Sequence, residues 1–550
     1  GLNVGDYYKK EVSVTINNSQ VTNVFEASSG NWSNTSNWSL NRLPISNDNV
    51  SIPSGKIANL DVSNVSIDDL DVVGALNVNS GKSITVTGNL TTTGTVSINS
   101  NATSSGSIIV NGTSTGNISY NRYIKDNANW YLVSSPVENQ DIDAFVSATS
   151  TLVTSGSKRG LATYDNVNQN WNYYLNGSST SGNFTIGDGY IIKLSAAGNV
   201  TFTGTLKTDN LSKNVTQGNN GWNLIGNSYP SFINVNSPAN NTNNILDLSS
   251  NFSILETGFK AIYIWDTVSQ SYKPVNNASD AKFLAPGQAY FVRVNANGNV
   301  VLNENMQSHQ AGDHFLRSNS NRFEIKLIAK KGDLEKNTDV KYIKGTTTGL
   351  DEGYDAGLFN ADGASFAVYT HLISESEGTN YALQALPNNN YSSMIVPVGL
   401  NAKKDDKITF SADIKNTPIG VKVYLEDKVK NEFKRLDNLE DLYEFTLSDD
   451  VNGVGRFYIH TSSKALSVNS QVTESSIKIF NTDNNTLKIV GLNSHEATLK
   501  LISVLGNEVF KTKLKNNNNQ EIVLPKLSEG VYFVQVKTEL EEINKKIILK

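Results

Sequence analysis

The sequence of 550 residues contains no cysteine, and only 18% of its residues are charged. The absence of cysteine excludes disulfide bonds and every cysteine-based metal site as sources of stability. The net charge of -6 is small for this length, and no run of Lys or Arg is flanked by aromatic residues, so nucleic acid is not an expected partner. No apolar run reaches the roughly 20 residues of a membrane-spanning helix, so we expect no transmembrane segment.

The first residues, GLNVGDYYKK, lack the charged and apolar regions of a signal peptide. We therefore expect a chain that is either already processed or part of something longer.

Common catalytic motifs are also missing. HExxH and GxxxxGK do not occur, so metalloprotease and phosphate-loop chemistry are not expected. The histidines are His309, His314, His371, His460 and His495. His309 and His314 flank Asp313 in a polar segment, where they form a poor metal pair. The sequence thus predicts no catalytic residue and no required cofactor.

Short strand-forming runs separated by Asn, Ser, Gly and Asp fill residues 33 to about 120. GALNVNS at 74–80 matches GTVSINS at 94–100, which places Leu76 over Val96 and Val78 over Ile98 at a shift of 20 residues. Such a repeat is typical of a parallel β-helix-like solenoid; a Ser/Thr-rich β-sandwich is the alternative. Trp32 and Trp38, just before it, are expected to cap the open end, with sugar stacking as the alternative role.

A longer internal repeat follows. NWYLVSSPVENQDIDAF, ATYDNVNQNWNYY and IGDGYIIKLSAAGNVTFTG recur in the same order about 100 residues later, as sequences starting at 221, 263 and 284. The alignment pairs Trp130 with Trp222, Asp165 with Asp266, Gly189 with Gln288 or its neighbours, and Tyr190 with Tyr290. The alternation of polar and apolar residues predicts two similar all-β modules.

The remaining chain is also predicted to be all-β. Alternating strands spaced by turns favour a jelly-roll-like sandwich, and a small antiparallel sandwich ends the chain. The predicted units are the capped solenoid (1–120), module copy 1 (121–210), module copy 2 (211–316), the sandwich (317–465), a linker (466–475) and the terminal domain (476–550).

The terminal domain resembles the type A C-terminal sorting domain of proteins exported by the type IX secretion system of Bacteroidota. The resemblance rests on LISVLGNEV, LPKLSEGVYFVQV and the final KKIILK, in this order. The matching residues are Gly506, Leu524, Gly530, Tyr532, Lys545, Lys546 and Lys550.

The resemblance implies a route and partners. A member of this family crosses the outer membrane through the type IX translocon, and its sorting domain docks on an outer-membrane shuttle protein. A sortase then removes the domain and often links the protein to surface lipopolysaccharide. The protein is therefore expected outside the cell or on its surface.

Two other candidate sites stand out. Asp351, Glu352 and Asp355 in GLDEGYD could hold calcium through oxygen ligands, or form a solvated turn. Thr267 in Asp-Thr-Val resembles a site of O-linked glycosylation in Bacteroidota.

Repeats without a catalytic constellation favour an adhesin-like binding or structural protein, not an enzyme, with extracellular glycans among its candidate partners. The alternatives are an extracellular polysaccharide lyase or hydrolase that uses the solenoid, where Asp68, Asp69 and Asp71 could line a groove, and the C-terminal part of a larger surface protein.

Overall fold

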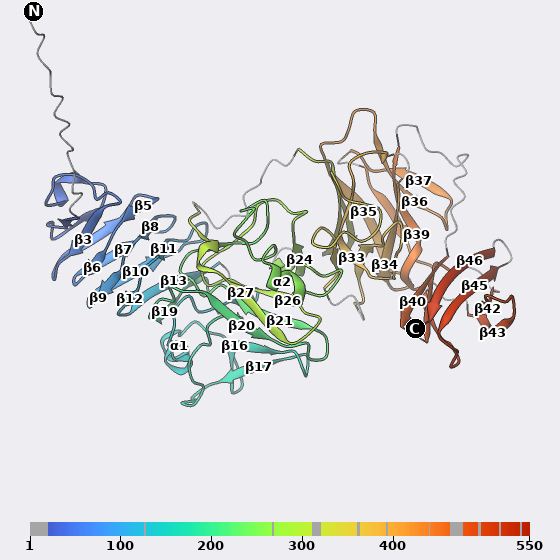
Figure 1. The fold of residues 1–550 in the computed structure, drawn as a ribbon, viewed down its shortest axis with the longest axis horizontal. Coiled ribbons are helices and arrows are strands. Elements are labelled where there is room, and N and C mark those ends of the chain that lie inside the picture. Colours follow the sequence, from blue (N-terminus) through green and yellow to red (C-terminus); the bar gives the residue numbers. More distant parts are fainter. Residues whose placement is uncertain are drawn as a thin grey trace, which may run out of the picture.

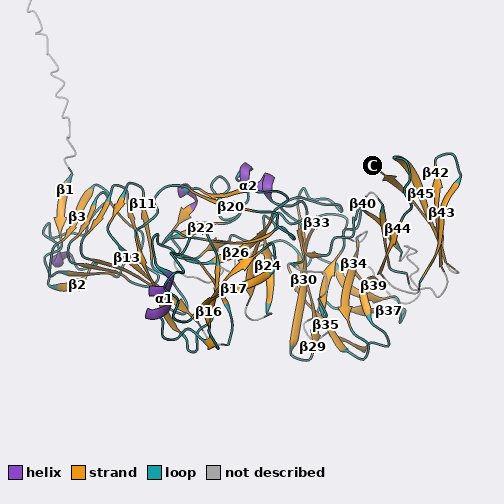
Figure 2. Ribbon diagram, turned by 90° about the horizontal axis from the view of Figure 1, so that it is seen from below, coloured by secondary structure: helices purple, strands orange, loops and turns teal. Residues whose placement is uncertain are grey.

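The computed structural model describes residues 20–125, 128–266, 269–310, 321–359, 364–391, 394–438, 441–462, 477–483, 485–492, 497–515, 519–538 and 542–549. The units follow one another along an extended molecule, from the solenoid at one end to the terminal domain at the other (Figure 1). Strands dominate in every unit, and helices are few and short (Figure 2). The prediction of an all-β fold is confirmed.

Three parallel sheets form the N-terminal unit. The first contains β1 (Val21–Val24), β3 (Asp48–Ile52), β6 (Leu70–Val72), β9 (Leu90–Thr92) and β12 (Ser114–Thr115). The second contains β2 (Ser29–Asn31), β4 (Ile57–Leu60), β7 (Ala75–Val78), β10 (Thr95–Asn99) and β13 (Ile118–Ile124). The third contains β5 (Val65–Ile67), β8 (Ser83–Val86) and β11 (Ser107–Val110).

Successive coils stack the apolar side chains that the sequence repeat aligns. Leu76 pairs with Val96 and Val78 with Ile98, and all four are buried. Gly94 is required at the corner because a Cβ there would lie 2.0 Å from the carbonyl oxygen of Gly74 in the coil below. The repeated glycine therefore marks the place where two coils meet.

Trp32 and Trp38 lie on either side of the short 3-10 helix η1 (Thr35–Asn37) and close the N-terminal end of this core. Both are buried, with ring centroids 4.6 Å apart, and the indole Nε1 of Trp38 donates to the carbonyl of Trp32 at 2.9 Å. Neither ring is exposed, and both pack into the core at this end.

The two repeated modules have matching sheets. Copy 1 contains β14 (Tyr131–Val133), α1 (Ile142–Ala148), β15 (Thr154–Ser155), β16 (Lys158–Asp165), β17 (Asn170–Leu175), β18 (Tyr190–Ile192) and β19 (Gly198–Gly204). Copy 2 contains β20 (Leu211–Val215), β21 (Trp222–Gly226), β22 (Phe232–Asn234), α2 (Ser249–Ile254), β23 (Ile262–Asp266), β24 (Ser271–Val275), β25 (Phe283–Leu284), β26 (Ala289–Arg293), β27 (Gly298–Leu302), η2 (Glu304–Met306) and β28 (Gln307–Ser308). The path β14-β18-β16-β17 in copy 1 corresponds to β21-β26-β23-β24 in copy 2.

The strand registers refine the alignment of the copies. Leu132 pairs with Ile191 in copy 1, and Leu224 pairs with Phe291 in copy 2. This register assigns Gly189 to Ala289 rather than to Gln288. The reason for glycine is steric, because a Cβ at position 189 would lie 2.9 Å from the Cβ of Ala289 and 2.5 Å from Cγ of Leu224.

The copies contact each other through reciprocal backbone hydrogen bonds. The N–H of Ser134 donates to Gly287 at 2.8 Å, and the equivalent N–H of Gly226 donates to Gly187 at 2.9 Å. Gly187 and Gly287 both have positive φ, +81° and +66°, which glycine adopts without steric cost. The two copies therefore pack against each other through equivalent contacts and are not independent modules.

The boundary predicted at residue 120 falls inside a strand. β13 closes the second solenoid sheet by pairing with β10 in parallel and pairs antiparallel with β19 of copy 1. It is also the counterpart of β20, which pairs with β27 in copy 2. One strand thus serves both units, so copy 1 begins near residue 118.

The sandwich region forms one sheet of eleven described strands, ten of them on one hydrogen-bonded path and one paired beside it. These are β29 (Glu324–Lys331), β30 (Leu334–Ile343), β31 (Ala356–Gly357), β32 (Ala367–Thr370), β33 (Tyr381–Pro387), β34 (Ile395–Ala402), β35 (Lys407–Lys415), β36 (Lys422–Asp427), β37 (Glu432–Arg435), β38 (Tyr443–Thr446) and β39 (Val451–Ser462). The path folds over one core, in which Leu327 of β29 and Phe457 of β39 are both buried. The strands thus form one continuous sheet instead of the two separate sheets of an ordinary sandwich. One pair in this sheet, β30 with β33, is parallel.

The terminal domain has two sheets, of three and four strands. They contain β40 (Lys478–Asp483), β41 (Thr486–Val490) and β44 (Asn519–Val523), and β42 (Ala497–Ser503), β43 (Glu508–Leu514), β45 (Gly530–Thr538) and β46 (Glu542–Leu549). Leu487 of one sheet and Val534 of the other lie in a common core.

Candidate functional sites

One end of the four-stranded sheet brings together three residues of the predicted sorting signal. Gly506, with φ +84°, lies in the turn between β42 and β43, and Ser503 at the start of that turn pairs with Tyr532. Gly530 pairs with Leu549 at the same end. The Tyr532 hydroxyl donates to the carbonyl of Ser528 at 2.8 Å, which fixes the chain before β45. Leu524 is buried in the core of the domain.

The two described lysines of the signal have different environments. Lys545 is half-buried; its ammonium donates to the carbonyl of Ile479 at 2.6 Å and lies 5.3 Å from the ring centroid of Phe480. Burial lowers the pKa of Lys545. Lys546 is exposed and pairs with Phe533. Lys550 lies outside the described residues. Lys545 therefore packs within the domain, whereas Lys546 is accessible.

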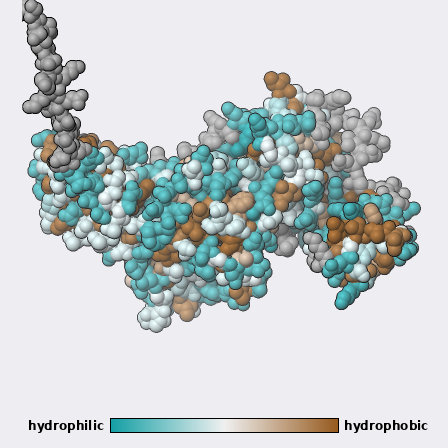
Figure 3. Space-filling model, in the orientation of Figure 1, coloured by the Kyte–Doolittle hydropathy of each residue, from teal (hydrophilic) through white to brown (hydrophobic). Residues whose placement is uncertain are grey.

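The terminal domain also exposes apolar side chains, namely Val504, Leu505, Val523, Phe533 and Ile548. Figure 3 shows brown, hydrophobic atoms gathered over this end of the molecule. The alternation of EGVYFVQV predicts that Val531 and Phe533 share the face opposite Tyr532, but only the structure shows that this face is uncovered.

The acidic candidates at 351–355 form a turn that is already satisfied by protein groups. Glu352 pairs with Lys260 at 2.5 Å, and Asp351 accepts from the N–H of Thr347 at 2.6 Å. Asp355 is buried and accepts from the N–H groups of Asp351 and Ala385, each at 2.7 Å. Burial raises the pKa of Asp355 to about 7, although these two N–H groups act in the opposite direction.

Across the described ranges, no group of three or more His, Asp or Glu side chains converges as metal ligands would. The three acids of the solenoid have separate environments in the described structure. Asp71 lies exposed on β6, Asp69 accepts from the N–H of Asn89 at 2.7 Å, and Asp68 accepts from Gln20.

His309 lies at the contact between module copy 2 and the solenoid. Its ring contacts Ser107 Oγ at 2.6 Å through Nδ1 and Thr85 Oγ1 at 3.0 Å through Nε2. Burial lowers the pKa of His309 to about 4. The ring thus joins the end of module copy 2 to the solenoid. His314, Asp313 and Thr267 lie outside the described residues.

The sequence does not reveal a cleft of about 500 Å³ between module copy 2 and the sandwich. The module wall includes Trp265 and Tyr272, whose ring centroids are 4.9 Å apart. Apolar groups of the sandwich, including Leu358 and Leu383, also line it. We call this space the junction cleft.

The sandwich wall of the junction cleft alternates positive and negative charges across neighbouring strands. In one row, Lys341 of β30 pairs with Glu324 of β29, which pairs with Lys415 of β35. In the next row, Asp339 pairs with Lys326, which pairs with Asp413. Side chains on one face of a sheet at these positions are close neighbours, so each carboxylate has an ammonium beside it.

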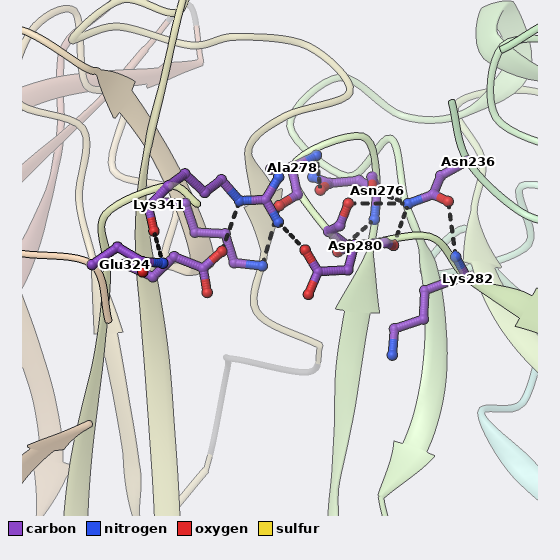
Figure 4. A network of polar contacts seen from close by, with 10 residues as sticks. Asn236, Asn276, Ala278, Asp280, Lys282, Glu324 and Lys341 are labelled. Atoms are coloured by element: carbon purple, nitrogen blue, oxygen red, sulfur yellow. Dashed lines mark hydrogen bonds and ion pairs between the residues drawn. The ribbon is translucent and has the colours of Figure 1, made fainter. Parts of the chain in front are cut away.

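The opposite wall is braced by a buried asparagine. The Asn236 side chain donates to the carbonyls of Asn276 and Asp280, each at 2.9 Å, and accepts from the N–H of Lys282 at 3.1 Å. Figure 4 shows this network fixing the loop that carries Asp280, with the Lys282 side chain extending away from Asn236. Asn236 was not predicted, because nothing in its sequence context separates it from other loop asparagines.

Bonds across the junction hold the two walls together. Arg322 pairs with Asp280 at 2.5 Å and with Glu324 at 2.7 Å, and Lys341 donates to the carbonyl of Ala278 at 3.2 Å (Figure 4). The hydroxyl of Tyr263 donates to the carbonyl of Gly357 at 2.9 Å. The cleft is therefore a fixed feature of the junction.

Burial changes the ionisation of several groups in the junction cleft. Burial lowers the pKa of Lys282 to about 8, with Asp280 acting against this shift and Lys341 and Lys273 adding to it. Burial also lowers the pKa of Lys336 and raises the pKa of Asp339. Perturbed groups that converge in a cleft indicate a binding site.

Comparisons with known proteins assign the chain to families. Residues 24–460 match a family model described as "Domain of unknown function (DUF8693)", and residues 461–550 match the "Secretion system C-terminal sorting domain". The chain belongs to the DUF8693 family and is a type IX secretion cargo protein. The predicted sorting domain is thus confirmed, and the cargo protein is exported to the cell surface or the extracellular space, in interaction with the type IX machinery.

Other comparisons add little to the assignment of the cargo protein. No curated protein matches it. A solved structure described as "Biofilm associated protein - BSP domain" is 8% identical, with 78% of this chain and 92% of that chain covered and a TM-score of 0.15. This score supports neither a shared fold nor a shared function. Among the helices described by the structure, none is long and apolar enough to cross a membrane.

Proposed function

We propose that the cargo protein acts outside the cell as an adhesin-like binding protein, and that the junction cleft is its binding site. The observation that carries this proposal is the cleft itself, with aromatic side chains on one wall and ordered charges on the other. Binding sites are typically concave, partly apolar and supplied with a few convergent polar groups. The proposal extends to extracellular glycans or surface lipopolysaccharide as partners.

A binding role rather than a catalytic one is supported by the pairing of the charges. Asp280 and Glu324 are both held by Arg322, and Asp266 is held by Lys273. Carboxylates held in fixed ion pairs present ordered charge to a ligand.

The test uses beads coated with the full chain and surfaces coated with extracellular polysaccharides. Asn337 lines the cleft on β30, and we expect Asn337→Trp to fill it and reduce bead retention at least fivefold. The matched control is Leu334→Trp at the exposed end of the same strand, which should leave retention unchanged. Release of new reducing ends or unsaturated products by the wild-type chain would contradict the proposal and favour an enzyme.

A further inference from the structure

Lysines outnumber carboxylates in the lining of the junction cleft, although the whole chain is net negative. The lining includes six lysines and five carboxylates; the lysines are Lys273, Lys282, Lys326, Lys336, Lys341 and Lys415. Arg322 neutralises part of the charge of Asp280 and Glu324, so the local balance is positive in a chain with a net charge of -6. A locally inverted charge favours a ligand of the opposite sign.

The same cleft has an apolar side that suits a ring. Trp265 and Tyr272 are half-buried neighbours on β23 and β24, and Leu358, Ala382 and Leu383 line the sandwich side.

We propose that the junction cleft binds an acidic oligosaccharide, a chain of sugar rings that carry carboxylate groups. The carboxylates would contact the lysines, and the apolar ring faces would lie against Trp265 and Tyr272. A neutral sugar would leave the lysine excess uncompensated, and a simple inorganic anion would leave the aromatic wall unused. This inference names the ligand class of the site in the proposed function and rests on it.

Lysine 282 links binding to pH. Because burial lowers the pKa of Lys282 to about 8, its charge is partly lost above that pH, whereas a bound carboxylate would favour the charged form. The neighbours that face it are Asp280, Lys341 and Lys273, and the first opposes the loss. Affinity for an acidic ligand should therefore fall as the pH rises from 7 to 9, and fall with added salt.

The experiment is calorimetric titration of the full chain with trigalacturonate, with cellotriose as the neutral trisaccharide. We expect trigalacturonate to bind and cellotriose to bind at least tenfold more weakly. Lys282→Gln, and independently Lys415→Gln at the exposed rim, should each weaken trigalacturonate binding about tenfold, because each removes one charged contact. The matched control is Lys407→Gln, an exposed lysine elsewhere on β35, which should leave binding unchanged.

Three results would overturn the inference: no binding of trigalacturonate, equal binding of cellotriose, or unchanged binding by both cleft variants. The bead assay run in parallel separates this failure from failure of the proposed function. If beads still adhere in an Asn337-dependent way while trigalacturonate does not bind, the adhesin proposal stands and the acidic ligand class is wrong. If adhesion is also absent, both proposals fail.

Discussion

His371 shows how a single buried side chain makes this protein sensitive to acid. It lies on the sandwich, 2% exposed, with Nε2 2.8 Å from Oδ1 of Asn380. Its ring is 5.8 Å from that of Phe480 in the sorting domain. Burial lowers the pKa of His371 to about 4; the Asn380 hydrogen bond opposes this shift, while Lys488 and Lys478 add to it. The neutral ring is therefore favoured in the folded state.

The consequence is a loss of stability between pH 6.5 and pH 4. Below pH 6.5 the unfolded chain takes up a proton at His371, while the folded chain stays neutral until about pH 4. At pH 5 this difference costs roughly 2 kcal/mol. His371→Gln removes this cost. When the pH is lowered from 7.5 to 5, the free energy of unfolding of the variant should therefore rise relative to that of the wild type by about this amount.

Hydrogen exchange of the amides of residues 366–372 in the full chain, corrected for intrinsic rates, measures this difference. Asp355, whose pKa is raised to about 7, contributes a pH dependence of the opposite sign, but it is present in both proteins and cancels. A difference of the same size at both pH values would show that His371 does not titrate as described.

At the scale of strands and sheets, contacts between equivalent elements hold the two modules together. Equivalent strands meet across the pair, and the small residues Gly189 and Ala289 lie at this contact. The sequence repeat predicts two copies, because their strands share spacing and turn residues. It does not predict that they pack face to face, because the reciprocal bonds of Ser134 and Gly226 join backbone groups that carry no sequence signal.

Gly189→Ala tests this contact. The added Cβ would lie 2.5 Å from Leu224 Cγ, so neighbouring side chains must shift, and we expect a loss of about 1–3 kcal/mol. Gly198→Ala is the matched control, because nothing lies within 4 Å of its added Cβ. Urea unfolding followed by tryptophan fluorescence reports on the modules through Trp130, Trp171, Trp222 and Trp265. Equal midpoints for the two variants would contradict the close packing.

The solenoid boundary illustrates a limit of strand patterns. ISYNRYI, the segment of β13, alternates only in its first half, and nothing in it shows that β13 pairs with β10 on one side and β19 on the other. The position of His309 was equally hidden, because its partners Thr85 and Ser107 lie more than 200 residues away in sequence.

At the scale of the whole molecule, the sequence predicts the features that come from repeated patterns or from a known motif. The all-β class, the duplication and the sorting domain each follow from local residue patterns. The junction cleft does not, because Trp265 and Lys341 belong to different units and their meeting depends on bonds such as that between Arg322 and Asp280. The proposed binding site therefore lies between two units, whereas the sequence patterns describe each unit by itself.

Export of the whole chain depends on its sorting domain, and cell fractionation tests this dependence directly. The full chain and a chain ending at Ser462, each behind a signal peptide, would be expressed in a type IX-competent bacterium and in a strain lacking the secretion pore. Antibody labelling of intact cells and of the medium should find the full chain outside only when the pore is present, and the shortened chain retained in the periplasm. Full-length protein outside cells that lack the pore, or shortened protein outside cells that have it, would contradict the assignment of this chain as a type IX cargo.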